Sequence, residues 1–313
     1  MAASADSLVV VSYNTENLFY PERDSLTDDT EWTPDGERHW SFTRYYRKEE
    51  NLARVLTTIG EWDGVDIVGM QEVENAMVVK RLCYTLRRGE YDYVHYDSPD
   101  RRGIDVALVY KKARIDTLRT RSIEVTGEGT DGERLVTRDI LYVCAWVDRR
   151  DTMHFFVCHL PSRRGGAAES EWKRDQAKRV LQSAIDSILT TDKNAQIIVM
   201  GDMNGAPKDD LKGVTNRMAN GERLKTSVDG THKYHGRWMY LDQFYLSPAL
   251  DSLSQTSVFA PDWLLEPDEK YMGLQPKRTY DGFHYRNGYS DHLPIVLRIA
   301  TDTASTSASC ESR

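Results

Sequence analysis

The chain has 313 residues, of which 40% are hydrophobic and 29% are charged. This composition is typical of a soluble globular protein, and no run approaches the roughly 18 apolar residues that a membrane-spanning helix needs. The formal net charge of -8 argues against a protein built for tight, non-specific binding to DNA, because such proteins are more often basic.

The two ends of the chain carry little information. Residues 1–7 lack the basic and apolar segments of a secretory signal, so we expect a soluble protein of unknown compartment. A chain from which such a signal had been removed would look the same. The Ser-, Thr- and Ala-rich residues 302–313 predict a flexible tail, and we expect one folded domain over residues 7–301.

The four cysteines, Cys83, Cys144, Cys158 and Cys310, have no close metal-type spacing, which argues against a zinc site. Cys144 and Cys158 lie in apolar, strand-like runs. They are either plain core residues or partners in a disulfide across adjacent strands, and the sequence leaves both possibilities open.

Short apolar runs of strand length recur along the chain, and many are rich in Val, Ile, Tyr and Phe, as strands are. They cover residues 8–13, 67–70, 106–110, 140–147, 154–160, 197–200, 241–246 and 293–299. Several are almost continuously apolar, which predicts sheets covered on both faces.

Helical periodicity is clearest over residues 169–189, and a second helix is predicted over residues 45–59. A third is predicted from Asn75, a good N-cap residue, to Leu86. Residues 19–42 and 259–289 look irregular, and long loops of this kind often form the rim of a functional site. Strands mixed with helices in no strict alternation predict an α/β sandwich.

Polar side chains stand at the ends of these apolar runs. The positions are Asn14, Glu72, His159, Asp202 with Asn204, Asp242, and Asp291 with His292. A charge beside a buried run is costly unless it is paired or bound to a metal. We therefore expect the strand ends to converge on one polar site.

This set of residues suits phosphoester hydrolysis. A hard cation such as Mg²⁺ prefers carboxylate and amide oxygens, and it neutralises charge that develops on the phosphate. A carboxylate can take the proton of the attacking water, and a histidine can donate a hydrogen bond to the phosphate oxygens.

Six sequence blocks, in this order, resemble the endonuclease/exonuclease/phosphatase superfamily. They are SYNTENL at 12–18, GMQEVEN at 69–75, CHLPSR at 158–163, GDMNGAP at 201–207, LDQFYLS at 241–247 and YSDHLPI at 289–295. The resemblance implies a four-layer α/β sandwich in which two mixed β-sheets pack face to face and are flanked by helices. It also implies a hydrolase dependent on Mg²⁺ or Mn²⁺ that uses an in-line water.

The resemblance assigns Asn14, Glu72 and Asp291 to the metal. Glu72 is then the principal metal carboxylate, Asn14 positions the metal shell and the phosphate, and Asp291 completes the shell or supports it.

The same resemblance assigns five catalytic residues. Asp202 activates the attacking water, Asn204 holds that water or the phosphate, and His292 contacts the scissile phosphate. Asp242 fixes the imidazole of His292. His159 is similar to the histidine of the deoxyribonuclease and lipid-phosphatase branches.

Substrate contacts are expected from Ser162, Arg163 and Arg164, and from the aromatic-rich segment that contains His232 and Tyr234. The two arginines lie in a Gly-rich turn and are candidates for gripping a second phosphate, or form a solvated basic turn. Abasic-site endonucleases usually have tyrosine and asparagine in place of His159 and Ser162, which argues against a role in abasic-site repair.

Other polar residues have a structural explanation. Asp24, Asp28, Asp29 and Glu31 are a candidate site for a structural Ca²⁺, but their spacing fits no Ca²⁺-binding loop, and we favour a solvated loop. We expect Asp105 to support the site from behind or to pair with Arg101 or Arg102.

The sequence supports three hypotheses for the function and the substrate. A nuclease or phosphodiesterase acting on nucleic acid is one hypothesis. A phosphatase or phosphodiesterase acting on an inositol phosphate, a phospholipid head group or another small phosphoester is the alternative. A non-catalytic metal-binding scaffold is a third, and in each case we expect a monomer.

Overall fold

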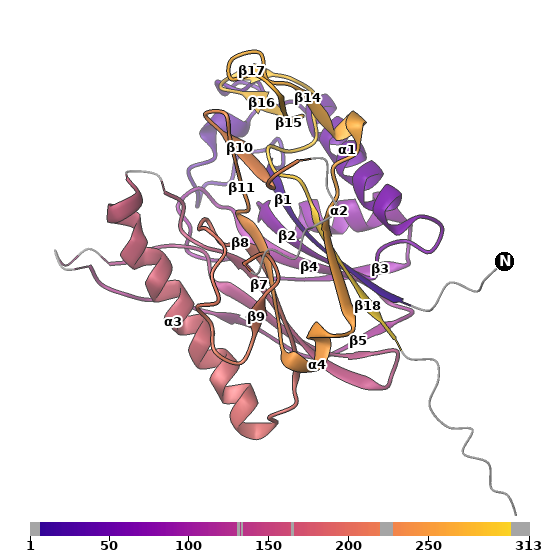
Figure 1. The fold of residues 1–313 in the computed structure, drawn as a ribbon. Helices are drawn as coiled ribbons and strands as arrows, with labels where there is room; N and C mark the ends of the chain where they lie inside the picture. The colour runs from indigo at the N-terminus through magenta and orange to yellow at the C-terminus, as the bar shows by residue number, and fades with distance from the viewer. Residues whose placement is uncertain (1–6, 130–131, 133, 164–165, 220–227, 302–313) are drawn as a thin grey trace, which may run out of the picture.

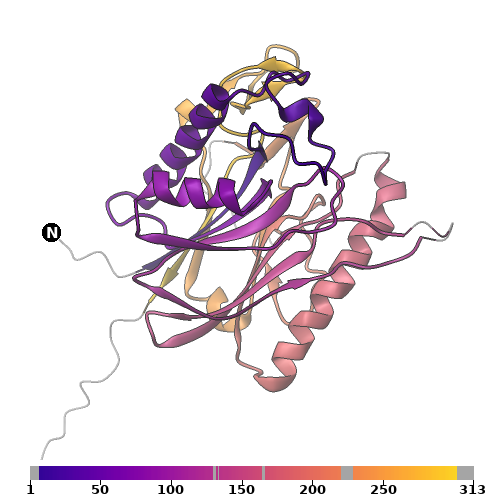
Figure 2. The same ribbon diagram turned by 180° about the vertical axis from the view of Figure 1, so that it is seen from behind.

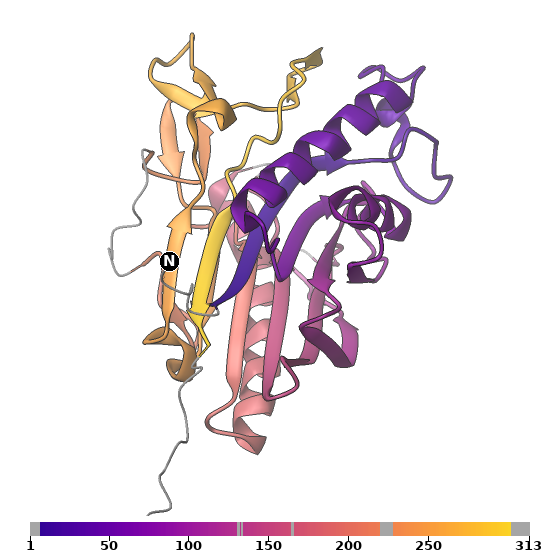
Figure 3. The same ribbon diagram turned by 90° about the vertical axis from the view of Figure 1, so that its right-hand side faces the viewer.

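The protein is an α/β sandwich, seen here in a computed structural model that describes residues 7–129, 132, 134–163, 166–219 and 228–301. Two six-stranded sheets lie face to face, and helices cover their outer faces (Figure 1). Figure 3 shows the two sheets close to edge-on. The predicted four-layer sandwich is therefore confirmed.

The first sheet is mixed, because β1 runs parallel to β2 and antiparallel to β18. In spatial order its strands are β13 (Ser254–Val258), β18 (Ile295–Ala300), β1 (Ser7–Leu18), β2 (Ile67–Val73), β4 (Asp105–Lys111) and β3 (Tyr91–His95). Ser7 pairs with Ala300, so the first and last described strands meet at the same end of this sheet.

The second sheet is mixed in the same way, since β7 runs parallel to β8 and the other pairs are antiparallel. Its strands, in spatial order, are β5 (Ile115–Ile123), β6 (Ile140–Val147), β7 (Asp151–His159), β8 (Gln196–Asp202), β12 (Asp242–Leu246) and β9 (Thr215–Asn216).

Helices cover the two outer faces on opposite sides of the molecule (Figures 1 and 2). On the first sheet lie α1 (Phe42–Gly60), which begins after its N-cap Ser41, and α2 (Ala76–Leu86), capped by Asn75 as predicted. On the second sheet lies α3 (Ala167–Thr191). A short α4 (Pro248–Asp251) follows β12.

The long irregular segments contain short elements of their own. These are η1 (Thr30–Trp32), η2 (Asp262–Leu264) and the paired strands β14 (Leu265–Pro267) with β15 (Leu274–Pro276), and β16 (Tyr280–Asp281) with β17 (His284–Tyr285). A further pair, β10 (His232–Tyr234) with β11 (Arg237–Met239), precedes β12.

One hydrophobic core fills the space between the sheets and reaches under α1 and α2, and a second lies between the second sheet and α3. Gly69 of β2 lets the sheets approach closely, because a Cβ at this position would lie 2.6 Å from Sδ of Met200 in β8. Protein interiors are close-packed, so this contact fixes the two sheets against each other.

Four strands of the two six-stranded sheets were missed in the sequence, and each lies at the edge of its sheet. They are β3, β5, β9 and β13. Edge strands have fewer covered neighbours and often carry polar residues, so they lack the continuous apolar run that marks an inner strand.

The disulfide considered for Cys144 and Cys158 is absent. Cys83, Cys144 and Cys158 are free and buried. Cys144 pairs with His154 in the ladder, whereas Cys158 lies beside Gly201, so the two thiols do not face each other. Cys310 lies outside the described residues. None of the helices within those residues has the length and apolarity needed to cross a membrane.

Candidate active site

The polar residues meet at one edge of the sandwich. The carboxyl ends of β1 and β2 and those of β7 and β8 reach this edge, which is where α/β sheets commonly place their sites. In the second sheet His159, Asp202 and Asp242 are direct neighbours on three adjacent strands. The antiparallel strands β12 and β18 begin here, so Asp242 and His292 arrive from the opposite direction.

Asn14 joins the two sheets. Its Nδ2 donates to Oδ2 of Asp202 at 3.1 Å and lies 3.4 Å from Oε1 of Glu72. The other carboxylate oxygen of Glu72 accepts a hydrogen bond from the backbone N–H of Asn17 at 2.9 Å. Glu72 lies where the β2–β4 register shifts, with a φ of 62°. This irregularity turns the carboxylate of Glu72 out of the ladder and toward the site.

Asp202 lies at the centre of the group. The residue before it is Gly201, which has a φ of 144°. A Cβ at Gly201 would lie only 1.9 Å from the carbonyl oxygen of Cys158, so only glycine fits there. One carboxylate oxygen accepts from the backbone N–H of Asn204 at 2.8 Å. Burial, together with the charges of Asp242 and Glu72, raises the pKa of Asp202 to about 6, and the charge of His292 opposes that rise. The carboxylate is therefore basic for an aspartate.

Asn204 lies two residues after Asp202, just beyond the end of β8. It has a φ of 47°, and its Nδ2 donates to the carbonyl oxygen of Leu160 at 2.9 Å. Because the side-chain nitrogen and the backbone N–H are both engaged, the side-chain oxygen is the group left to face a ligand.

His292 is oriented by Asp242. Its Nδ1 lies 2.7 Å from Oδ2 of Asp242, and its Nε2 lies 3.9 Å from Oδ2 of Asp202. Burial disfavours the charged imidazole, but the carboxylates of Asp242, Asp202 and Asp291 hold its pKa well above the usual value. His292 is thus protonated at neutral pH, with Nε2–H directed at the centre of the site.

His159 differs from His292 in charge. Its Nε2 lies 3.6 Å from Oδ2 of Asp202 and 3.8 Å from Oε1 of Glu72. Burial and then the positive charge of Arg138 hold its pKa well below the usual value. One neutral and one protonated histidine therefore flank the same carboxylate.

Asp291 lies beside the histidines. Its Oδ2 is 3.8 Å from Nε2 of His232, whose ring centroid lies 4.6 Å from that of His292. Burial alone would raise the pKa of Asp291, but its interactions with His232 and His292 hold it far below the usual value. Ligand atoms of these three residues lie within 4.8 Å of one another. Within the described residues, no hydrogen bond or ion pair joins Asp291 to Glu72 or Asn14.

The residues around Asp202 fit a hard divalent cation. Three buried or half-buried carboxylates, those of Glu72, Asp202 and Asp242, lie close enough for the charges of Glu72 and Asp242 to raise the pKa of Asp202. Such a concentration of negative charge is costly without a positive counterpart. Oxygen donors of this kind are the ligands that Mg²⁺ prefers.

A second buried pair, Glu16 with Lys48, supports the site from behind, and its role was missed in the sequence. The carboxylate of Glu16 accepts hydrogen bonds from the backbone N–H groups of Thr279 at 2.6 Å and Tyr280 at 3.1 Å. Nζ of Lys48 lies 3.9 Å from Glu16 and donates to the carbonyl oxygen of Tyr289. The pair therefore ties α1 and β1 to the segment that leads into His292. A usable signal was present, because Lys48 falls on the apolar face of α1.

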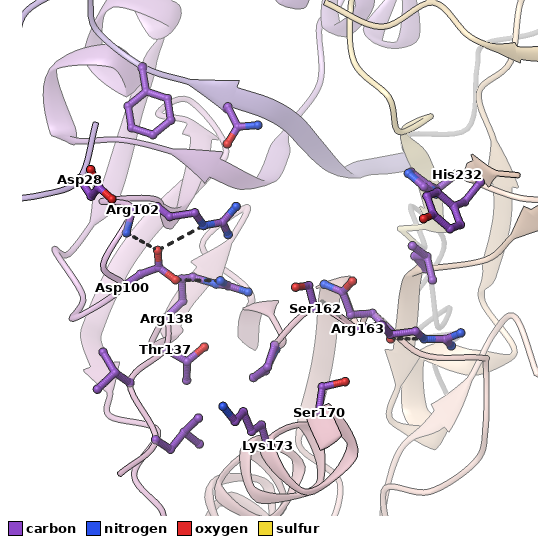
Figure 4. A pocket seen from close by; sticks show the side chains of 18 of the residues that line it. Asp28, Asp100, Arg102, Thr137, Arg138, Ser162, Arg163, Ser170, Lys173 and His232 are labelled. Carbon is purple, nitrogen blue, oxygen red and sulfur yellow. Dashed lines mark hydrogen bonds and ion pairs between the residues drawn. The ribbon is translucent and has the colours of Figure 1, made fainter. Parts of the chain in front are cut away.

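The reactive cluster is the group formed by Asn14, Glu72, His159, Asp202, Asp242 and His292. A cavity of about 1240 Å³ opens beside it. Figure 4 shows side chains that line this cavity. Asn17, Asn204 and His232 line the cavity, and each also contacts a residue of the cluster. The expected contact residues Ser162, Arg163, His232 and Tyr234 line the cavity. Nε of Arg163 donates to the carbonyl oxygen of Asn204 at 3.1 Å. Arg164 lies outside the described residues.

The acidic loop differs from the solvated loop that we expected. Asp29 is only 1% exposed, and one of its carboxylate oxygens accepts from the backbone N–H of Asp24 at 2.7 Å. Glu31 pairs with Arg38 at 3.1 Å, and Asp28 is exposed at the cavity. Asp29 thus holds the loop together, and nothing in the described residues gathers the four carboxylates around one point.

Asp105 has a structural environment, but its partners differ from the expected arginines. It accepts from the backbone N–H of Ser98 at 3.1 Å and lies 3.3 Å from Nε2 of His95. Arg102 pairs with Asp100 instead, at 3.6 Å.

The fold is shared with several solved structures. TDP2 from C. elegans matches with a TM-score of 0.61 and 16% identity, covering 94% of this chain and 75% of that chain. The mannosyl-6-phosphatase Bt3783 from Bacteroides thetaiotaomicron matches with a TM-score of 0.59 and 17% identity, covering 93% and 98%. The human Nocturnin catalytic domain matches with a TM-score of 0.54 and 18% identity, covering 93% of each chain. At these identities the likeness shows the fold alone.

Comparison at the level of sequence gives the family. No curated protein matches the chain. The model of the endonuclease/exonuclease/phosphatase family matches residues 9–301, which include all six blocks that carry the resemblance. The chain therefore belongs to the endonuclease/exonuclease/phosphatase family.

Proposed function

We propose that this protein hydrolyses a phosphoester bond with the help of Mg²⁺, for which Mn²⁺ can substitute. The observation that carries the proposal is the surroundings of one atom, Oδ2 of Asp202. The Nδ2 of Asn14 and the Nε2 atoms of His159 and His292 lie 3.1, 3.6 and 3.9 Å from it. A carboxylate that faces one neutral and one protonated histidine suits proton transfer next to a developing negative charge.

We assign the metal to the carboxylate of Glu72, with Asp291 as a further candidate. Asn14, which the resemblance assigned to the metal, is proposed instead to position that carboxylate, because its Oδ1 accepts a hydrogen bond from the backbone N–H of Glu16 at 3.0 Å. When bound, Mg²⁺ supplies Lewis-acid stabilisation of the phosphate oxygens and positions the water. Asn14 holds Glu72 and Asp202 at a fixed separation through its Nδ2. Asp291, which lies nearer the histidines, also holds His232 against His292.

Asp202 is the proposed general base. Its carboxylate accepts a proton from the attacking water, whose oxygen forms the new bond to phosphorus as the ester P–O bond breaks. A base with a pKa of about 6 is ionised at neutral pH and still basic enough to accept that proton. The side-chain oxygen of Asn204 is placed to accept a hydrogen bond from the same water.

His292 is the proposed donor to the phosphate. Its Nε2–H points to the site because Nδ1–H is bound by Asp242 at 2.7 Å. The imidazolium stabilises the negative charge that grows on the phosphoryl oxygens, and a fixed donor needs no reorganisation during the reaction. His159, which is neutral, contributes a hydrogen bond without adding charge.

We favour a phosphodiester of nucleic acid as the substrate. Trp172 and Tyr234 line the cavity beside the reactive cluster, and aromatic rings of this kind stack on bases. The net charge of -8 and a cavity walled by α3 and by the loop after β1 favour the alternative, a small phosphoester such as an inositol phosphate or a phospholipid head group.

A substrate panel tests both parts of the proposal. Purified protein is incubated in Mg²⁺ with plasmid DNA, RNA, inositol phosphates and sphingomyelin, each with the Asp202→Asn variant as a matched control. We expect turnover on one class of substrate, lost on chelation and in the variant. If the protein shows no metal-dependent turnover on any of these phosphoesters, the proposed function is wrong and the hypothesis of a non-catalytic metal-binding scaffold replaces it.

A further inference from the structure

We propose that Thr231 is a positioning residue for the reaction, because its hydroxyl and its backbone carbonyl together fix Asp242 against His292. The inference rests on the proposed hydrolase function, in which the imidazolium of His292 donates to the phosphate. Thr231 acts through the Asp242–His292 pair and is not itself proposed to contact the phosphate or the metal.

Thr231 lies directly before β10, where β10, the start of β12 and the segment after His292 meet. The residue is fully buried. Its carbonyl oxygen accepts a hydrogen bond from the backbone N–H of Leu293 at 2.7 Å. His292 itself forms an isolated antiparallel bridge with His232, the residue after Thr231. The backbone at Thr231 therefore holds the chain that carries the reacting imidazole.

The hydroxyl of Thr231 holds the other half of the pair. Its Oγ1 accepts hydrogen bonds from the backbone N–H groups of Leu241 and Asp242, each at 3.2 Å. The same hydroxyl donates to the carbonyl oxygen of Met239 at 3.4 Å. A hydroxyl has one donor and two acceptor positions, so all of them are used here. Buried backbone N–H groups are costly without an acceptor, and this oxygen supplies one for both residues.

The hydroxyl takes the place of a neighbouring strand. On one side, β12 pairs with β8 from Asp242 to Leu246. On its other side, β9 pairs only with Tyr245 and Leu246, so among the described residues no strand lies beside Asp242 there. The backbone N–H of Asp242, which a strand would otherwise bond, is given to Thr231 instead.

The carboxylate of Asp242 has few restraints besides its own backbone. Its Oδ2 lies 2.7 Å from Nδ1 of His292. Its Oδ1 is buried, and no group in the part of the chain that the structure describes donates a hydrogen bond to it. The position of the carboxylate thus depends on the backbone that Thr231 holds. Misplacement of a catalytic group by about 1 Å can cost about 100-fold in rate, so this restraint matters for turnover.

Two substitutions separate the hydroxyl from the size of the side chain. Thr231→Val keeps the shape but removes the acceptor, and Thr231→Ser keeps the hydroxyl. On the phosphoester that the wild type hydrolyses, Thr231→Val is expected to lower kcat by about tenfold or more. KM should change by less than about twofold, because no substrate contact is removed. Thr231→Ser should keep at least about half of the wild-type kcat. Thr231→Ala replaces the valine variant if urea denaturation shows that the latter is unfolded.

Ser247 gives a matched control at the opposite end of β12. It is buried, and its Oγ accepts the backbone N–H of Ile197 at 3.0 Å. Ser247→Ala therefore removes a buried acceptor of the same kind, next to the end of the strand that is farthest from Asp242. It should lower stability to urea, as Thr231→Val does, but leave kcat unchanged.

A double-mutant cycle shows whether Thr231 acts through Asp242. In an Asp242→Asn background, Thr231→Val should lower kcat by less than about twofold, because the pair that it positions is already broken. A purely structural role would give the full loss again in that background.

Proton NMR tests the same claim without turnover. The Nδ1–H of His292, bonded to Asp242, is expected to resonate downfield of the amide region, and its signal is assigned by its absence in His292→Ala. The signal should persist in Thr231→Ser and Ser247→Ala and be shifted or lost in Thr231→Val.

Four results would each overturn the inference: an unchanged kcat and an unchanged resonance in Thr231→Val, an equal loss in Thr231→Ser, an equal loss of kcat in Ser247→Ala, or an additive loss in the Asp242→Asn background. Failure of the proposed function is distinguishable. In that case the wild type hydrolyses no phosphoester, and the NMR comparison still decides whether Thr231 fixes the Asp242–His292 pair.

Discussion

At the scale of single residues, the site depends on how each environment changes an ordinary side chain. Asp202 and Asp242 are both buried aspartates on neighbouring strands. Asp242 is bound to an imidazole, whereas Asp202 faces a second carboxylate, and burial raises its pKa to about 6. Two chemically identical groups thus acquire different roles, one as an orienting residue and one as a base.

Asp202→Asn should lower kcat by about 10³-fold or more, because an amide of the same shape cannot accept the proton of water. The thermal midpoint should change little, since an amide can keep the hydrogen bonds to the side chain. Steady-state kinetics on the substrate identified by the panel gives the measurement. A variant that retained more than about a tenth of the wild-type rate would assign the base elsewhere.

His292→Ala should cut kcat by about 100-fold or more, as expected for loss of a transition-state donor. Asp242→Asn should give a milder defect of the same kind, because the imidazole remains but loses its fixed orientation and its charge partner. The two variants are compared at equal Mg²⁺. Full activity of His292→Ala would exclude contact between this residue and the reacting phosphate.

The pH dependence follows from the same environment. A base must be deprotonated to act, so a raised pKa shifts activity to higher pH. At fixed Mg²⁺, kcat/KM should rise as the pH passes through about 6, the pKa of Asp202, and then level off. A flat profile between pH 5 and pH 7 would contradict the assignment of Asp202, because ionisation of the base would then not limit the rate.

At the scale of elements, the buried Glu16–Lys48 pair connects α1, β1 and the segment before His292. The side chain of Lys48 is fully buried and that of Glu16 is 8% exposed. Burial lowers the pKa of Lys48 and raises that of Glu16. Each group is stabilised by the other and by the hydroxyl and backbone groups of Thr279.

Lys48→Ala should destabilise the fold by about 3–5 kcal/mol, because it leaves a buried carboxylate without its partner. Combining it with Glu16→Gln should recover part of that loss. Urea denaturation of the wild type, the single variants and the double variant gives the coupling free energy. Arg47→Ala, which removes an exposed pair with Glu50, is the control and should cost less than about 1 kcal/mol. A similarly small cost for Lys48→Ala would show that the pair is not needed to join these elements.

At the scale of the whole molecule, the two sheets pack against each other through apolar side chains, and at the active edge the hydrogen bond from Asn14 to Asp202 joins them. A cation bound there should stabilise the folded state as a whole, because the unfolded chain does not gather its ligands. At a Mg²⁺ concentration of about 100 times Kd the gain is about 2.7 kcal/mol.

The thermal midpoint should therefore rise by roughly 4 °C on replacing EDTA with Mg²⁺ at about 100 times Kd. Glu72→Gln should reduce this rise and shift it to higher Mg²⁺, while the midpoint in EDTA should not fall, since the variant removes one charge from the acidic cluster. Scanning calorimetry measures both effects independently of activity. An unchanged Mg²⁺ response in Glu72→Gln would remove this residue from the metal site.

The sequence by itself determined the inner strands, the three long helices and the residues that carry chemistry. These depend on local patterns: apolar runs, helical periodicity and motifs such as GDMNGAP, in which glycine precedes the aspartate. The edge strands β3, β5, β9 and β13 escaped prediction because their side chains are not buried on both faces.

Only the tertiary structure decided which polar residues touch. Asn14 and Asp202 are 188 residues apart in the chain, and their hydrogen bond depends on sheet order and strand register, which no local pattern encodes. The same holds for Glu16 with Lys48, and for the two cysteines that do not meet. The folded environment completed the assignment, because burial raises the pKa of Asp202 and lowers that of His159, whereas the carboxylates around His292 raise its pKa.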